Sequence, residues 1–190
     1  MKLEILQFSE VDNLTQFISF WSKLYFYNGE NMYDELIEKE KLSEEDLLKL
    51  YIWKNGTNLS KLKNIAFETK ILSKLVIINN MKLNDFSLED FLIEFDDLSA
   101  VWKIFLLHVI KPNTYPIYDQ HVHRTFHKIN SLEWEGISND NISNKNKEKF
   151  YFGLYLPFLK ENNIKDFRKL DKAFFAYGQF LKTNLGKQNL

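Results

Sequence analysis

The chain has no cysteine among its 190 residues, and it has only six glycines and three prolines. Without cysteine it can form no disulfide, no thiolate metal site and no cysteine-ligated iron–sulfur cluster. The absence of cysteine also fits a reducing compartment, so we expect a cytoplasmic protein. The first residues, MKLEILQF, show no long apolar region of the kind found in signal peptides. We therefore expect no secretory leader.

Long apolar runs and an excess of charge are also missing. No run is long enough to span a bilayer, so the sequence predicts no membrane partner. The net charge is −1, which provides no overall positive field for nucleic acid, and any such surface must be a local patch. What the chain does have is 45% hydrophobic and 16% aromatic residues, which is enough for a sizeable core.

Apolar side chains recur at intervals of three and four residues, which is the spacing of amphipathic helices. This pattern predicts helices at residues 14–25, 32–37, 44–55, 58–76, 87–95, 100–110, 120–129, 150–160 and 165–185. No long stretch shows the period-two alternation of a half-buried sheet. Only residues 2–8 and Val76–Ile78 are plausible strands, and the Asn- and Ser-rich segment Ser131–Lys147 is predicted to be a loop.

The predicted fold class is therefore all-α. We expect a single compact unit over residues 1–190, built from two helical lobes with a cleft between them. The first lobe would cover about residues 30–130 and contain a helical hairpin. The second would combine the N-terminal helix with residues 131–190.

The most informative stretch runs from Ala100 to His127. Ala100–Ile110 is almost entirely apolar, which predicts a buried helix that Pro112 ends, because proline cannot continue a helix. A turn follows, and Asp119 stands where the next helix should begin, the position that aspartate favours as an N-cap.

Two parts of this region resemble the helix-hairpin-helix DNA glycosylase superfamily, which includes the adenine, thymine-glycol and 8-oxoguanine glycosylases. The first is a pair of helices joined by a short hairpin at Leu98-Ser99-Ala100-Val101. The second is Pro116-Ile117-Tyr118-Asp119 followed by Val122-His123-Arg124, which matches the family's proline–hydrophobic–aspartate motif and the helix after it. The resemblance covers roughly residues 88–130.

The resemblance implies a two-lobed helical bundle that binds DNA and cleaves or recognises a modified or damaged base after flipping it out of the helix. It places the family's catalytic aspartate at Asp119. A carboxylate there would stabilise the positive charge that develops on the sugar. Further DNA-binding or pocket candidates around this motif are Ser99, Trp102, Lys103, Tyr115, Tyr118, His121, His123 and Arg124.

The sequence also departs from the family pattern. The family hairpin carries glycines that let backbone N–H groups approach a phosphate, whereas no glycine lies between Gly56 and Gly136 here. The lysine nucleophile of bifunctional members is absent, since its position falls near Ala100 or Val101 and Lys103 is off register. The resemblance therefore implies a monofunctional enzyme with no cofactor and no iron–sulfur cluster.

Other interpretations remain open. Asp119 can be an N-cap alone, Arg124 a surface arginine and Lys103 a solvated helix residue. His123 and His127 lie four residues apart, and with His121 they offer metal-ligand types, but no acidic ligand follows at a known spacing, so we predict no metal. The main alternative function is a non-catalytic helical module that binds DNA or protein and has lost the hairpin glycines.

Overall fold

A computed structural model describes Val11, residues 13–132 and residues 142–188, and these residues form helices and no strand. The elements are α1 (Leu14–Trp21), η1 (Ser22–Leu24), α2 (Glu30–Ile37), α3 (Glu44–Asn55), α4 (Lys61–Lys70), η2 (Leu72–Lys74), α5 (Leu75–Leu83), α6 (Leu88–Glu94), α7 (Ala100–Ile110), α8 (Gln120–Ile129), α9 (Asn144–Phe150), the π-helical turn η3 (Tyr151–Tyr155), α10 (Leu156–Glu161), α11 (Phe167–Phe180) and α12 (Asn184–Gln188). The predicted all-α class is confirmed.

Local sequence signals explain where several helices begin. Ser43 forms a reciprocal capping box with Asp46 at the start of α3, and the Ser87 hydroxyl accepts two backbone N–H groups at the start of α6. α7 begins and ends where its sequence predicts. Ser99 is its N-cap residue, although the Ser99 side chain makes no capping hydrogen bond.

Three local predictions were wrong. The single helix predicted over residues 58–76 is divided into α4, the turn η2 and the start of α5. Val76–Ile78 lies inside α5 and is not a strand, because the preceding turn η2 leads directly into this helix. The predicted loop Ser131–Lys147 contains the start of α9, since the Ser143 hydroxyl accepts the Asn146 N–H and caps that helix. The other suggested strand, residues 2–8, lies outside the described residues.

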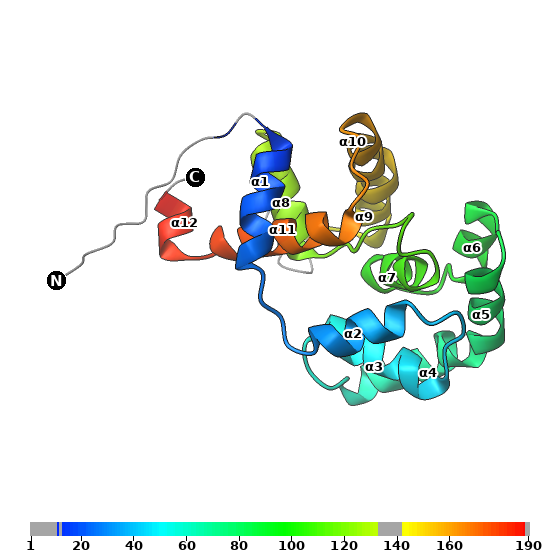
Figure 1. The fold of residues 1–190 in the computed structure, drawn as a ribbon. Helices are drawn as coiled ribbons and strands as arrows, with labels where there is room; N and C mark the ends of the chain where they lie inside the picture. The colour runs from blue at the N-terminus through cyan, green and yellow to red at the C-terminus, as the bar shows by residue number, and fades with distance from the viewer. Residues whose placement is uncertain (1–10, 12, 133–141, 189–190) are drawn as a thin grey trace.

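The core consists of two hydrophobic clusters that meet at α7. Phe105, Leu106 and Val109 of this helix belong to the cluster formed with α2–α6, whereas Ile104 belongs to the cluster formed with α1, α8–α11 and η3. Figure 1 shows the corresponding two bodies, with α7 between them. No helix of the described part of the chain is long and apolar enough to cross a membrane.

α8 lies very close to α11, and this contact sets the position of the N-terminal end of α8. Gly178 allows the approach, because a side chain there would collide with the backbone of His121. The Thr125 hydroxyl donates to the Phe174 carbonyl at 2.7 Å, and Arg124 Nη1 donates to the Gly178 carbonyl at 2.6 Å. Asp119, at the start of α8, is therefore held beside α11.

Candidate active-site cavity

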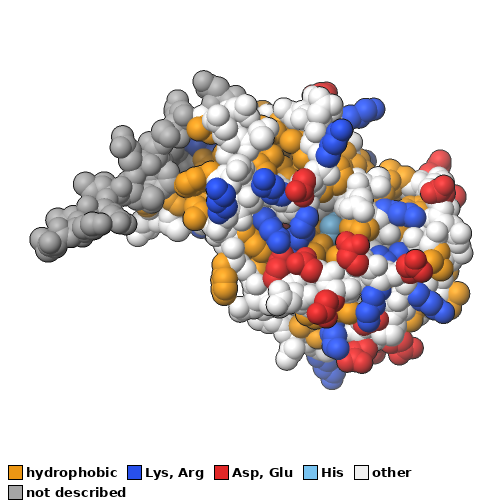
Figure 2. Space-filling model, in the orientation of Figure 1, with side chains coloured by type: hydrophobic (Ala, Val, Ile, Leu, Met, Phe, Trp, Pro, Cys, Tyr) orange, Lys and Arg blue, Asp and Glu red, His pale blue; other side chains and the backbone are white. Residues whose placement is uncertain are grey.

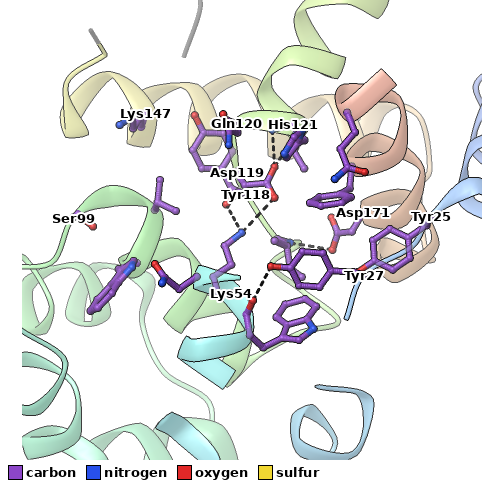
Figure 3. Close-up of a pocket in the computed structure, with 18 of the residues that line it drawn as sticks. Tyr25, Tyr27, Lys54, Ser99, Tyr118, Asp119, Gln120, His121, Lys147 and Asp171 are labelled. Atoms are coloured by element: carbon purple, nitrogen blue, oxygen red, sulfur yellow. Dashed lines mark hydrogen bonds and ion pairs between the residues drawn. The ribbon is translucent and has the colours of Figure 1, made fainter. Parts of the chain in front are cut away.

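A cavity of about 710 Å³ lies where the two bodies meet. Its walls come from α3, the start of α7, the segment that leads into α8, and α11, so no single stretch of sequence forms it. Its volume lies within the range of about 300–1,000 Å³ that is common for small-ligand pockets. Figure 3 shows Lys54 pointing toward Asp119, and both residues line this cavity.

The two carboxylate oxygens of Asp119 have different roles. Oδ1 accepts the backbone N–H groups of His121 at 2.8 Å and of Val122 at 3.0 Å, so Asp119 is the N-cap of α8 as its sequence position predicts. Oδ2 lies 3.6 Å from the ammonium nitrogen of Lys54. Asp119 is therefore an N-cap that also lines the cavity.

Lys54, the penultimate residue of α3, is the main positive partner of Asp119. Its side chain is only 8% exposed, and its ammonium group donates to the Tyr118 carbonyl at 3.0 Å (Figure 3). The same nitrogen lies 5.7 Å from the centre of the Phe105 ring. Burial lowers the pKa of Lys54, while the nearby Asp119 carboxylate opposes that change.

The environment favours the ionised form of Asp119. Burial by itself would raise the pKa of this carboxyl. The charges of Lys54 and His121 and the two capping N–H groups outweigh burial and hold the Asp119 pKa below its usual value. At neutral pH the cavity thus contains a carboxylate whose position is fixed by a helix start.

A second carboxyl group, Asp171 of α11, lies in another part of the cavity among aromatic rings. The residue is 3% exposed, and Oδ2 accepts the Ile117 N–H at 3.1 Å. Burial raises the pKa of Asp171 to about 8, against the opposing effects of Arg168, the Ile117 N–H and Lys54. The aromatic residues that line the same cavity are Tyr25, Tyr27, Trp53, Trp102, Tyr118 and Phe175.

The cavity brings together five of the nine candidates predicted from the sequence: Ser99, Trp102, Tyr118, Asp119 and His121. Ser99 and Trp102 come from the start of α7 and the others from the start of α8. The start of α7 and the start of α8 therefore lie on one cavity.

The remaining four candidates do not line the cavity. Lys103 is buried, with an ion pair of 2.9 Å to Glu148, so the expectation of a solvated lysine was wrong. Arg124 is also buried and donates to the Gly178 carbonyl, which corrects the expectation of a surface arginine. Tyr115 is half-buried between the two hydrophobic clusters, and its carbonyl oxygen lies 2.7 Å from His108 Nδ1.

His123, the fourth of these, is buried 3.0 Å from the Tyr118 hydroxyl, and burial lowers its pKa to about 3. Its ring stacks on that of His127, with centroids 4.0 Å apart, while His121 lies beside Phe175. The described residues contain no group of three His, Cys, Asp or Glu side chains that could hold a metal ion.

Sequence reasoning missed Lys54 and Asp171. Lys54 is one of several lysines near a helix end, and Asp171 stands inside an amphipathic helix with lysines on both sides. One signal was available for Asp171, because the apolar stripe of α11 places this residue next to Leu170 and Phe174 at core positions. No comparable signal in the sequence marks Lys54.

Comparison with known proteins shows no relative. No family model, no curated protein and no solved structure matches this chain. The resemblance to DNA glycosylases therefore stays a prediction from the motif residues between positions 88 and 130.

Proposed function

We propose that this protein is a DNA-base N-glycosylase, or a close functional equivalent, that acts on a modified or damaged base flipped into the cavity. The observation that carries the proposal is the Asp119 carboxylate, which is ionised, held at a helix start, and placed on a cavity with aromatic walls. The position of Asp119 behind Pro116-Ile117-Tyr118 matches the catalytic aspartate of the resembling family.

The proposed reaction uses the charge of Asp119. As the bond between the sugar carbon and the base nitrogen breaks, the bonding electrons leave with the base and positive charge develops on the sugar. A carboxylate held in a fixed position beside the sugar stabilises that charge. Water then adds to the sugar carbon, one of its protons is lost, and the departing base takes up a proton. The step needs no metal or cofactor.

Lys54 contributes to this site by keeping Asp119 ionised and by fixing its second oxygen. The Lys54 nitrogen is also bound to the Tyr118 carbonyl, so it ties α3 to the segment before α8. A sugar that approaches Oδ2 of Asp119 would meet this pair at the cavity wall. We therefore assign Lys54 a positioning role in the proposed reaction.

The test is a cleavage assay on duplex and single-stranded DNA that contains a panel of oxidised, alkylated, deaminated and mismatched bases, with the free base as the product measured. The matched variants are Asp119→Asn and Asp166→Asn. Asparagine is also a good N-cap, so both variants should keep their helix starts. Asp166 caps α11 on the surface, away from the cavity.

We expect the parent and Asp166→Asn to release at least one base, and Asp119→Asn to be slower by about a hundredfold or more, as for loss of a transition-state electrostatic contact. Equal rates for Asp119→Asn and the parent, or no release from any substrate by a parent that binds DNA, would contradict the proposal.

A second candidate function is a non-catalytic helical module that binds DNA or protein, and one observation favours it. The Ala100 N–H, at the start of α7 where a hairpin would meet a phosphate, donates to Asn144 Oδ1 of α9 at 3.1 Å. The Lys103–Glu148 ion pair also joins α7 to α9. The face shown in Figure 2 carries basic and acidic side chains intermixed.

Salt dependence separates the two functions. A protein that neutralises several phosphates loses DNA affinity steeply as salt rises, because counterions are released on binding. Salt-sensitive binding to DNA together with base release supports the glycosylase. Binding to DNA without release of any base supports the non-catalytic module.

A further inference from the structure

The Asp171 carboxyl has one oxygen without a partner. Oδ2 accepts the Ile117 N–H, whereas Oδ1 is buried and has no hydrogen-bond partner among the described residues. A buried polar atom left unpaired costs about 1–3 kcal/mol, and an external partner such as a ligand would remove that cost. Asp171 lines the cavity, so a ligand there can provide that partner.

Aromatic side chains line the same cavity as Asp171. Tyr27 and Phe175 line the same cavity with their rings nearly perpendicular, at 86° and a centroid distance of 5.4 Å. The Tyr27 hydroxyl is already used, since it donates to the Trp53 carbonyl at 2.9 Å (Figure 3). These side chains therefore offer mainly apolar ring surfaces to a ligand.

The charged side chains near Asp171 form ion pairs with other residues. Arg168 ion-pairs with Glu30 and lies 3.8 Å from Asp34, and its guanidinium stacks 4.4 Å from the Tyr33 ring centre. Lys54 and Asp119 form their own pair. No ion pair to Asp171 forms within the described residues, so its carboxyl stays available to a neutral polar ligand.

We propose that Asp171 Oδ1 is the hydrogen-bond partner of the heterocyclic base in the cavity, which makes Asp171 a specificity-determining residue. This inference rests on the proposed function, since the base would be the one extruded from DNA. The two carboxyl groups would then contact different parts of the nucleotide. Asp119 faces the sugar, and Asp171 contacts an edge of the base beside the aromatic rings of the cavity.

The chemistry of the contact follows from the protonation of Asp171. Burial raises its pKa to about 8, so the carboxyl is protonated at neutral pH. Oδ2 accepts the Ile117 N–H, so the proton resides on Oδ1, the oxygen without a partner. The matching ligand atom is an acceptor, which means a carbonyl oxygen or an unprotonated ring nitrogen of the base.

The experiment measures binding of free purine and pyrimidine bases to the full chain by calorimetry or ligand-observed NMR. Indole serves as a flat control ligand, because it has an N–H donor and no ring acceptor. The variants are Asp171→Asn, which keeps a donor at the Oδ1 position, and Asp171→Leu, which removes it. We expect at least one base to bind the parent, and Asp171→Leu to bind it about tenfold more weakly, as for loss of one buried hydrogen bond.

A pH profile separates recognition from a structural role. The affinity of the parent for the base should fall as pH rises through about 8, since Oδ1 then loses its proton. Asp171→Asn should bind the same base with no such fall. The groups that face Asp171, namely Arg168, Lys54, Asp119, Tyr33, Tyr151 and Tyr155, are unchanged in this variant, so the difference between the two profiles isolates Asp171.

Three results would overturn the inference: no base binds the parent, indole binds as well as the bases, or the parent and Asp171→Asn have the same pH profile. The last comparison holds even if Asp171→Leu fails to fold. If the protein gives any of these results but still releases a base from DNA, the role of Asp171 is wrong and the proposed reaction stands. Base binding that depends on Asp171, in a protein that releases no base from DNA, would overturn only the proposed reaction.

Discussion

Replacing Asp171 with asparagine should change how the stability of the protein depends on pH. The carboxyl is buried in the folded state, with a pKa raised from 3.8 to about 8, whereas the unfolded chain exposes it to water. Between these two pKa values the folded state binds a proton that the unfolded state has lost. Stability therefore decreases as pH rises through this interval, and the decrease is complete above the folded pKa.

The magnitude follows from the shift. One bound proton of difference changes the free energy of unfolding by about 1.4 kcal/mol per pH unit. Because the pKa of Asp171 rises by about four units on folding, the free energy of unfolding should fall by about 5 kcal/mol in total across this interval. Asparagine keeps an oxygen to accept the Ile117 N–H and cannot ionise, so the variant lacks this pH dependence.

The assay is urea unfolding of the parent and Asp171→Asn across a pH series. The stability of the parent relative to the variant should fall by about 1.4 kcal/mol per pH unit between about pH 5 and pH 7. Asp166→Asn, which removes an exposed carboxylate, controls for the loss of one negative charge. Parallel curves for the parent and Asp171→Asn over this interval would refute the reasoning, because they would mean that Asp171 ionises in the folded protein as it does in the unfolded chain.

The other predictions concern stability and DNA binding. Lys54→Met should destabilise the protein by about 3 kcal/mol in urea unfolding, because it leaves the Asp119 carboxylate without its partner, and an unchanged midpoint would argue against the pair. Gly178→Ala should cost about 2 kcal/mol or more, since its side chain would collide with the backbone of α8. The control Gly153→Ala, whose added methyl group would meet no atom outside its own helical turn within 4 Å, should be neutral or stabilising by thermal unfolding. Arg124→Met should cost about 2 kcal/mol through its lost hydrogen bond to α11. Its DNA affinity should keep the salt dependence of the parent, whereas a shallower slope would show that Arg124 contacts a phosphate.

Some features of the site could be predicted because they depend on neighbours in the chain. An aspartate that follows a proline-containing turn and precedes an amphipathic segment caps a helix wherever that helix packs, and Asp119 does so. Ala100–Ile110 is almost wholly apolar, and α7 lies between the two hydrophobic clusters. The burial of Lys103 and Arg124 could not be predicted in this way, because each contacts a partner on a helix that is distant in the sequence.

The sequence by itself determined an all-helical chain, the bounds of α7 and the N-cap role of Asp119, since periodicity, proline and capping act over a few residues. Tertiary structure decided the chemistry of the cavity. Lys54 and Asp171 come from α3 and α11, far from Asp119 in the chain, and only the packing of both bodies around α7 brings them to one cavity. Their altered pKa values follow from the same cause, because burial and the charges of distant helices exist only once the chain has folded.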